Sequence, residues 1–187
     1  MFRKSLTLFV IAGILATFSL LASAYFTAQA TVSNNTFTTG TLNLTVAPTT
    51  SALTFNNMAP GDAVTAPITV TNSGSLQLRY AMTSASTNTD SKNLAAQMTL
   101  QIKSGVTTCT SAGFGVDGTS IYSGTLAAAL FGDPAQGTQV GDRTLNASAS
   151  EALCFRADLP SNSGNAYQGA TTTTTFTFSA EQTANNP

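Results

Sequence analysis

Beyond residue 40, apolar and polar side chains alternate with a period of two along most of the chain. Every second residue is apolar at Leu42, Leu44 and Val46, for example, and the residues between them are Thr or Asn. This period, combined with many β-branched residues, is typical of strands that bury one face. The pattern predicts strands over residues 41–46, 64–71, 76–82, 98–102, 153–159 and 172–178.

The strands over residues 64–71 and 76–82 are separated only by Asn-Ser-Gly-Ser at residues 72–75. Two alternating segments joined by such a turn predict a β-hairpin over residues 64–82. Pro67 has no backbone N–H to donate, so its strand should lie at a sheet edge or begin there.

Helical patterns are short by comparison. Residues 93–97 and 126–131 each allow only one or two helical turns, which is too little for a packed amphipathic helix. Several strands separated by Gly-, Asn-, Ser- and Pro-containing turns predict an all-β fold, a single jelly-roll-like β-sandwich. No fixed repeat and no shift in composition marks a boundary inside it.

The first 24 residues have the parts of a signal peptide. Two basic residues precede an uncharged apolar stretch over residues 6–21, and the small residues Ala22 and Ala24 follow in the spacing that signal peptidases cleave. Cleavage after Ala24 would leave Tyr25 at the N-terminus. The alternative is an uncleaved anchor, but a stretch of about 16 residues is shorter than the roughly 20 of a membrane span. The chain would therefore contact the membrane only through this peptide, before cleavage.

Residues 25–40 are predicted to be an N-terminal strand and linker, detached from the sandwich domain in residues 41–187. Phe26, Ala28, Ala30 and Val32 share one parity, which is a strand pattern at a free terminus, and Phe37 follows. Two interpretations remain open at this point. The segment is either the first strand of its own domain or a donor strand that pairs with a neighbouring molecule.

Charge and composition exclude several classes of function. The chain has 7 Lys and Arg, not clustered beyond the N-terminal pair, so it lacks the basic surface of a nucleic-acid-binding protein. It has no His, the commonest general base and metal ligand, and this argues against an enzyme and predicts no cofactor. Only 8% of its residues are charged, against about 25% in typical domains. A neutral, hydroxyl-rich surface favours an extracellular β-protein.

Cys109 and Cys154 are the only cysteines. In an exported chain such a pair predicts a disulfide, which would stabilise the fold by about 4 kcal/mol in the chain-entropy view. The alternative is two unrelated buried thiols.

Two further motifs are of low specificity. Pro60-Gly61-Asp62 is typical of a tight turn before a strand, and a cation site based on one carboxylate is the weaker interpretation. Asn34, Asn43 and Asn146 lie in glycosylation sequons that a Thr-rich chain produces by chance.

Three sequence blocks together resemble the TasA/camelysin family of exported biofilm-matrix fibre proteins. That family has a Phe just past the cleavage site and then Phe-x-x-Gly-Thr-Leu-x-Leu, which is similar to residues 25–27 and 35–44 of this chain. Residues 58–62 with 70–76, and the ending at residues 176–182, are similar to the family too. The blocks bracket nearly all of the chain beyond residue 24.

The resemblance implies a jelly-roll fold, export by a signal peptidase, and polymerisation into extracellular fibres in which the N-terminal strand of one subunit completes a sheet of the next. The expected partners are therefore copies of the same chain, joined head to tail, in the matrix or at the cell surface. A monomeric secreted or surface binding module is the alternative. The family also carries a metalloprotease description, which a chain without His does not support.

The signal peptide leads to a first testable prediction. The secreted protein should begin at Tyr25 or Phe26, because Ala22 and Ala24 place the scissile bond there. N-terminal sequencing of the extracellular fraction measures this directly. An extracellular species that retains Met1 would contradict it.

Overall fold

A computed structural model describes residues 28–186 of the chain. These fall into two compact units, one ending at Thr38 and the other beginning at Thr39. Within the described residues, no helix has both the length and the apolar character needed to cross a membrane.

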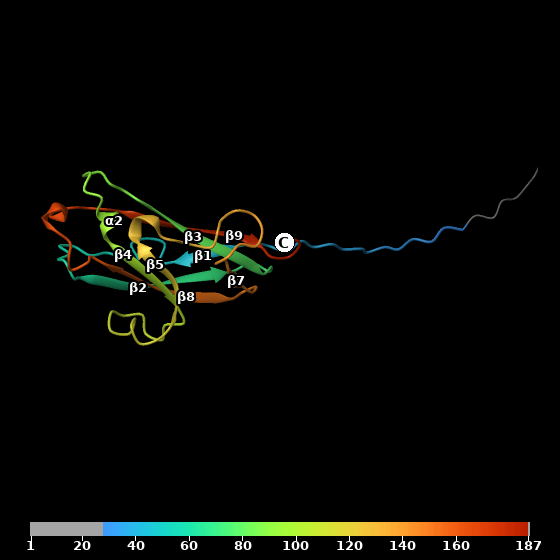
Figure 1. Cartoon of the computed structure of the whole chain (residues 1–187). Coiled ribbons are helices and arrows are strands. Elements are labelled where there is room, and N and C mark those ends of the chain that lie inside the picture. Colours follow the sequence, from blue (N-terminus) through green and yellow to red (C-terminus); the bar gives the residue numbers. More distant parts are fainter. Residues whose placement is uncertain (1–27, 187) are drawn as a thin grey trace, which may run out of the picture. The chain divides into compact units, whose positions relative to one another are not determined.

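The second unit is a sandwich of two antiparallel sheets (Figure 1). The first sheet has the strand order β1-β2-β8-β4-β5, and in the second sheet β6, β7 and β9 all pair with β3. The strands of the first sheet are β1 (Leu44–Ala47), β2 (Ala63–Asn72), β8 (Ser150–Asp158), β4 (Thr99–Ser104) and β5 (Thr119–Thr125). Those of the second are β3 (Leu78–Ser86), β6 (Leu130–Phe131), β7 (Arg143–Leu145) and β9 (Thr174–Gln182). The predicted all-β sandwich is confirmed.

Helical structure in the described chain is limited to three short pieces. They are the single α-helical turn α2 (Leu94–Gln97) and the 3-10 turns η1 (Leu126–Ala128) and η2 (Asn165–Tyr167). The alternation had predicted six of the nine strands, to within a few residues at each end. It missed β5, β6 and β7, which are short or largely exposed and so carry little apolar periodicity.

The core lies between the sheets and consists of the apolar residues of each alternating strand. Tyr80 of β3 and Phe155 of β8 are its largest fully buried side chains. The ring of Phe155 lies 5.2 Å from that of Phe176 in β9, so it contacts the opposite sheet. Tyr80 packs edge to face on Phe131, with ring centroids 5.9 Å apart. Such aromatic pairs stabilise a core beyond the area they bury.

The predicted hairpin over residues 64–82 is wrong. Strand β2 pairs with β1 and β8, whereas β3 pairs with β6, β7 and β9. The short connection after Asn72 therefore crosses from one sheet to the other. A hairpin and a crossing have the same alternation, because in both cases each strand directs one face toward the core.

Asn72 explains why the chain crosses here. Its side chain is fully buried, and Nδ2 lies 2.8–3.2 Å from three backbone oxygens, those of Leu76, Leu145 and Asn146. Its Oδ1 accepts a hydrogen bond from the N–H of Gly74 at 3.0 Å. One amide thus ties the end of β2, the start of β3 and the end of β7 together, and satisfies backbone groups that a turn would otherwise leave buried and unpaired.

A second polar cluster connects the sheets. The hydroxyl of Tyr80 in β3 donates to Glu151 of β8 at 2.6 Å, and Arg143 of β7 forms an ion pair with the same carboxylate. Burial, followed by the hydrogen bond to Glu151, raises the pKa of the Tyr80 hydroxyl. Burial alone would raise the pKa of Glu151 too, but the hydrogen bonds from Arg143 and Tyr80 outweigh it and hold that pKa below its usual value. The carboxylate therefore stays charged between the sheets.

Pro67 lies at an open edge, in agreement with the sequence prediction. Strand β1 is only four residues long and pairs with Thr69–Asn72 of β2. Residues 63–68 of β2 consequently have a described neighbour on one side only, strand β8. The missing N–H of Pro67 costs no ladder hydrogen bond on the open side.

Replacing Asn72 by Ala tests the crossing. Three backbone carbonyls, one of them buried and two partly buried, would lose this donor, so the free energy of unfolding should fall by about 3 kcal/mol. Urea unfolding followed by circular dichroism measures it. Asn165→Ala is the control, because that side chain is exposed and has no hydrogen bond among the described residues, and its effect should stay within about 0.5 kcal/mol. Equal stability of both variants would show that Asn72 does not hold the crossing.

Candidate strand-binding groove

An apolar groove of about 1030 Å³ opens along one side of the sandwich. Its walls come from both sheets, with Val64 and Ile68 on β2 and Phe176 and Phe178 on β9. The segment between β1 and β2 and the chain leading into β9 also line it, and Leu94, Met98, Leu126, Ala157 and Leu159 contribute further apolar surface. The groove therefore gives access from solvent to the edge of the core.

One wall of the groove is the free edge of β9. In the described chain β9 pairs only with β3, so its other edge has no strand beside it. Thr173 accepts a hydrogen bond from the N–H of Thr87 at 2.9 Å, and Thr183 donates to Gln77 at 3.2 Å. Odd-numbered residues thus direct their backbone groups toward β3. Because these directions alternate in an antiparallel strand, the even-numbered residues Thr174, Phe176 and Phe178 direct their N–H and C=O groups to the open edge.

The lining of the groove contains no charged residue. The N-terminal part of the chain shares this property, because no Asp, Glu, Lys or Arg occurs from residue 5 to residue 61. A neutral strand can fill such a groove without leaving a charge buried and unpaired.

The predicted donor segment is described from Ala28 onward. Residues 28–38 have no helix or strand, and all of their side chains are exposed. Val32 is 85% exposed and Phe37 94% exposed, which is unusual for large apolar side chains. Asn35 donates one local hydrogen bond to the carbonyl of Val32. Ala30 is exposed as well.

The other residues singled out near the N-terminus lie outside the described part of the chain. They are the cleavage residues Ala22, Ala24 and Tyr25 and the first donor residue, Phe26.

Cys109 and Cys154 are bonded to each other, with their Cα atoms 5.5 Å apart. Cys154 is in the central strand β8, on its outer face, and the bond holds the loop of residues 105–118 over that face. Phe114 of this loop is only 3% exposed, and Lys103 Nζ lies 4.8 Å from its ring centroid. The sequence did not indicate that Phe114 is buried, because the residues around it have no apolar periodicity.

Asp62 belongs to a turn, as the preferred interpretation had it. Its side chain accepts a hydrogen bond from the N–H of Ala59 at 2.7 Å, and its own N–H donates to the carbonyl of Ala59. Among the described residues, Asp62 belongs to no group of three His, Cys, Asp or Glu side chains that could hold a cation.

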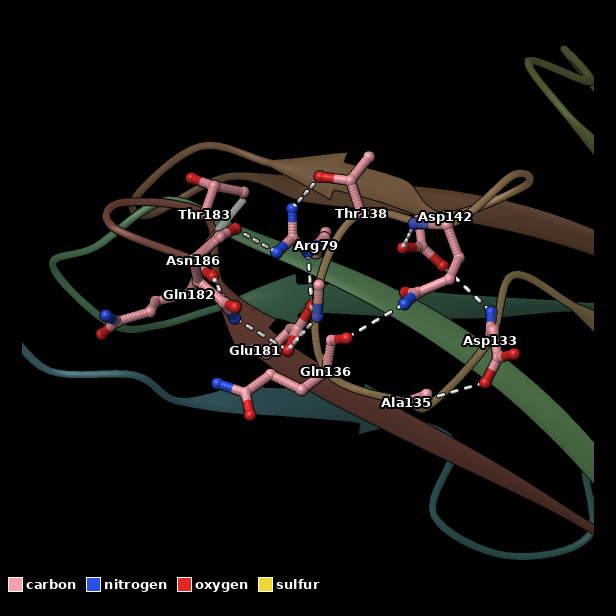
Figure 2. Close-up of polar contacts among 12 residues, drawn as sticks. Arg79, Asp133, Ala135, Gln136, Thr138, Asp142, Glu181, Gln182, Thr183 and Asn186 are labelled. Carbon is pink, nitrogen blue, oxygen red and sulfur yellow. Dashed lines mark hydrogen bonds and ion pairs between the residues drawn. The ribbon is translucent and has the colours of Figure 1, made fainter.

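Acidic residues do gather on the outer face of the second sheet, around Arg79 (Figure 2). Arg79 is 6% exposed and donates to Glu181 and Thr138, each at 2.5 Å, and to the carbonyl of Asn186. The hydrogen bond from Arg79 is the largest of the effects that lower the pKa of Glu181. Asp142 accepts hydrogen bonds from the backbone of the loop that covers Arg79. These carboxylates anchor a loop and the end of β9.

The acidic residues of the chain do not fit a catalytic metal site. Each of the eight carboxylates accepts a hydrogen bond from the protein. One buried carboxylate oxygen, Asp158 Oδ2, has no partner, but Asp158 is already paired with Arg156, whose positive charge disfavours a cation. Within residues 28–186, no three His, Cys, Asp or Glu side chains lie close enough together to hold a metal ion.

The fold and the groove define a β-sandwich protein with one open side. A family model described as "Camelysin metallo-endopeptidase" matches residues 1–186, and the chain belongs to this family, which includes TasA-like proteins. The resemblance found in the sequence is thereby confirmed. At the level of the family, this is a secreted, matrix-associated protein of the cell surface or extracellular space.

No curated protein matches the chain. Among solved structures, the ASH / PapD-like domain of human CEP192 (PapD-like domain 7) is 14% identical, with a TM-score of 0.31 over 85% of this chain and 96% of that one.

The disulfide leads to a prediction about stability. Changing Cys109 and Cys154 to Ser should lower the free energy of unfolding by about 4 kcal/mol, because the unfolded chain regains the freedom of the 45-residue loop. The fold should persist, since the main core lies on the other face of β8. Urea unfolding measures the loss, and Val116→Ala, an exposed change in the same loop, is the control. Free reaction of both cysteines with a thiol reagent in the native exported protein would contradict the disulfide.

Proposed function

We propose that the chain is a structural subunit that polymerises into extracellular fibres by donor-strand complementation. Residues 25–37 of one copy would lie in the groove of the next copy and add a strand to the free edge of β9. The head-to-tail contact does not close on itself, so it extends into a filament. The subunit has no catalytic role in this proposal.

The observation that carries the proposal is an edge of β9 that has no neighbour among the described strands and borders an uncharged apolar groove. Such an edge offers N–H and C=O groups to an incoming strand, and the groove offers pockets to every second side chain. The exposed, uncharged residues 28–37 have the matching properties. A strand of six residues spans about 20 Å.

Side-chain burial would supply much of the affinity. In this arrangement Phe26, Ala28, Ala30 and Val32 face the acceptor core, and the polar residues between them face solvent. Burying a Phe side chain contributes about 1.5–3 kcal/mol, so Phe26 is expected to be the principal anchor. Cleavage of the signal peptide just before Phe26 would free the N-terminus of the strand. Assembly would then begin only after export.

Deletion of Tyr25–Val32 tests the proposal. The truncated protein should fold, because all strands of the sandwich lie beyond residue 43, but it should remain monomeric. The full mature chain should form filaments under the same conditions. Electron microscopy and sedimentation measure assembly, and circular dichroism confirms the fold. If the truncated protein polymerises as well as the full chain, another surface drives assembly.

Hydrogen exchange in the same samples tests whether the edge of β9 accepts the added strand. The amides of Thr174, Phe176 and Phe178 should exchange rapidly in the monomer and slowly in the filament. Thr175 and Thr177 are the internal control, because their amides already face β3 and should be protected in both states. Filaments in which Phe176 stays unprotected would exclude β9 as the acceptor. A mature chain that stays monomeric at high concentration would favour the alternative, a monomeric surface binding module.

A further inference from the structure

The segment of residues 48–58, here called the strap, joins β1 to β2 and lines the groove. It has neither helix nor strand. None of its backbone or side-chain groups forms a hydrogen bond with the described part of the chain. Eight of its eleven residues are exposed and the other three are half-buried, so water can pair their backbone groups. Moving the strap would therefore break no hydrogen bond to the described part of the chain.

Apolar contacts hold the strap in place. Ala52, Leu53 and Met58 pack against the core, whereas Phe55 remains 46% exposed. Ser51 and Asn57 have positive φ angles of 51° and 58°, a conformation that Ser in particular adopts at some cost. The strap thus covers apolar surface with a few side chains, and its backbone forms no hydrogen bond with any strand of the described chain.

This cover is also incomplete. With the strap in place the groove still has a volume of about 1030 Å³, and no strand of the described residues lies beside the outer edge of β9. An added strand would fill the volume and pair with the edge, which the strap does not do. The strap and an added strand would contact the same apolar surface, but the added strand would cover more of it.

We propose that the strap is a removable cover of the acceptor groove, which the strand of a second copy displaces during assembly. This rests on the fibre function proposed above and concerns its regulation. In the monomer, the strap shields the apolar groove from unspecific contacts. Its release contributes to the barrier for elongation, so weaker packing of the strap means faster growth.

Leu53→Ala tests this role of the strap. The variant removes a core contact of the strap, and the rate at which monomer adds to preformed filament seeds should rise about five- to tenfold. Leu130→Ala is the matched control, because Leu130 is 55% exposed on β6 and does not line the groove, and its elongation rate should be unchanged. Elongation of Leu53→Ala at the unaltered rate, or more slowly, would overturn the proposal. If Leu53→Ala does not fold, replacement of residues 51–57 by Gly and Ser at equal length provides the same comparison.

Proteolysis of the unmodified protein provides a readout that needs no variant. Chymotrypsin should cleave after Leu53 and Phe55 faster in filaments than in monomers, because strand insertion releases the strap. Equal or slower cleavage in filaments that depend on residues 25–32 would show that the strap stays in place, and donor-strand assembly would stand without it. Filaments that form without residues 25–32 would instead overturn the fibre mechanism on which the strap depends.

Discussion

The arrangement of the sandwich depends on the buried side chain of Asn72. Its side-chain amide forms hydrogen bonds with backbone groups from three parts of the chain, at the point where β2 ends. Because these groups are satisfied, the chain can cross to the second sheet within a few residues. Strand β2 is then available to β8, and β3 to β9. A hairpin at this place would pair β2 with β3, and both sheets would then have a different strand order.

One consequence of the crossing is that one side of the sandwich stays open. Strand β1 covers only part of β2, and β9 ends the second sheet in the described chain. Soluble proteins usually protect such edges with charges, prolines or bulges. Here Pro67 protects β2, but the edge of β9 carries Thr and Phe and borders an uncharged groove. An edge left in this state is a liability in a monomer and an advantage in a subunit, since few charges oppose the contact between copies.

The family description as a metallo-endopeptidase contrasts with the local chemistry of this chain. The ligands of a protein-bound zinc ion must converge on one point. The carboxylates of this protein instead hold turns, loops and one ion pair between the sheets, as Asp62, Asp142 and Glu151 illustrate. Their positions are explained by hydrogen bonds and ion pairs within the protein, and no three of them converge on one point among the described residues.

The alternation of Leu, Val and Thr determined the all-β class and six of the strands from the sequence alone, because the period of two depends only on which face of a strand meets the core. The Cys pair and the block similarity to the family were likewise readable without coordinates. Which strands become neighbours was not, since a crossing at Asn72 and a hairpin have the same period. Contacts between residues far apart in the chain decide the burial of Phe114, the position of the strap and which edge of β9 lacks a neighbour among the described strands. Only the tertiary structure decides such contacts, because they depend on what lies beside a strand and not on the strand itself.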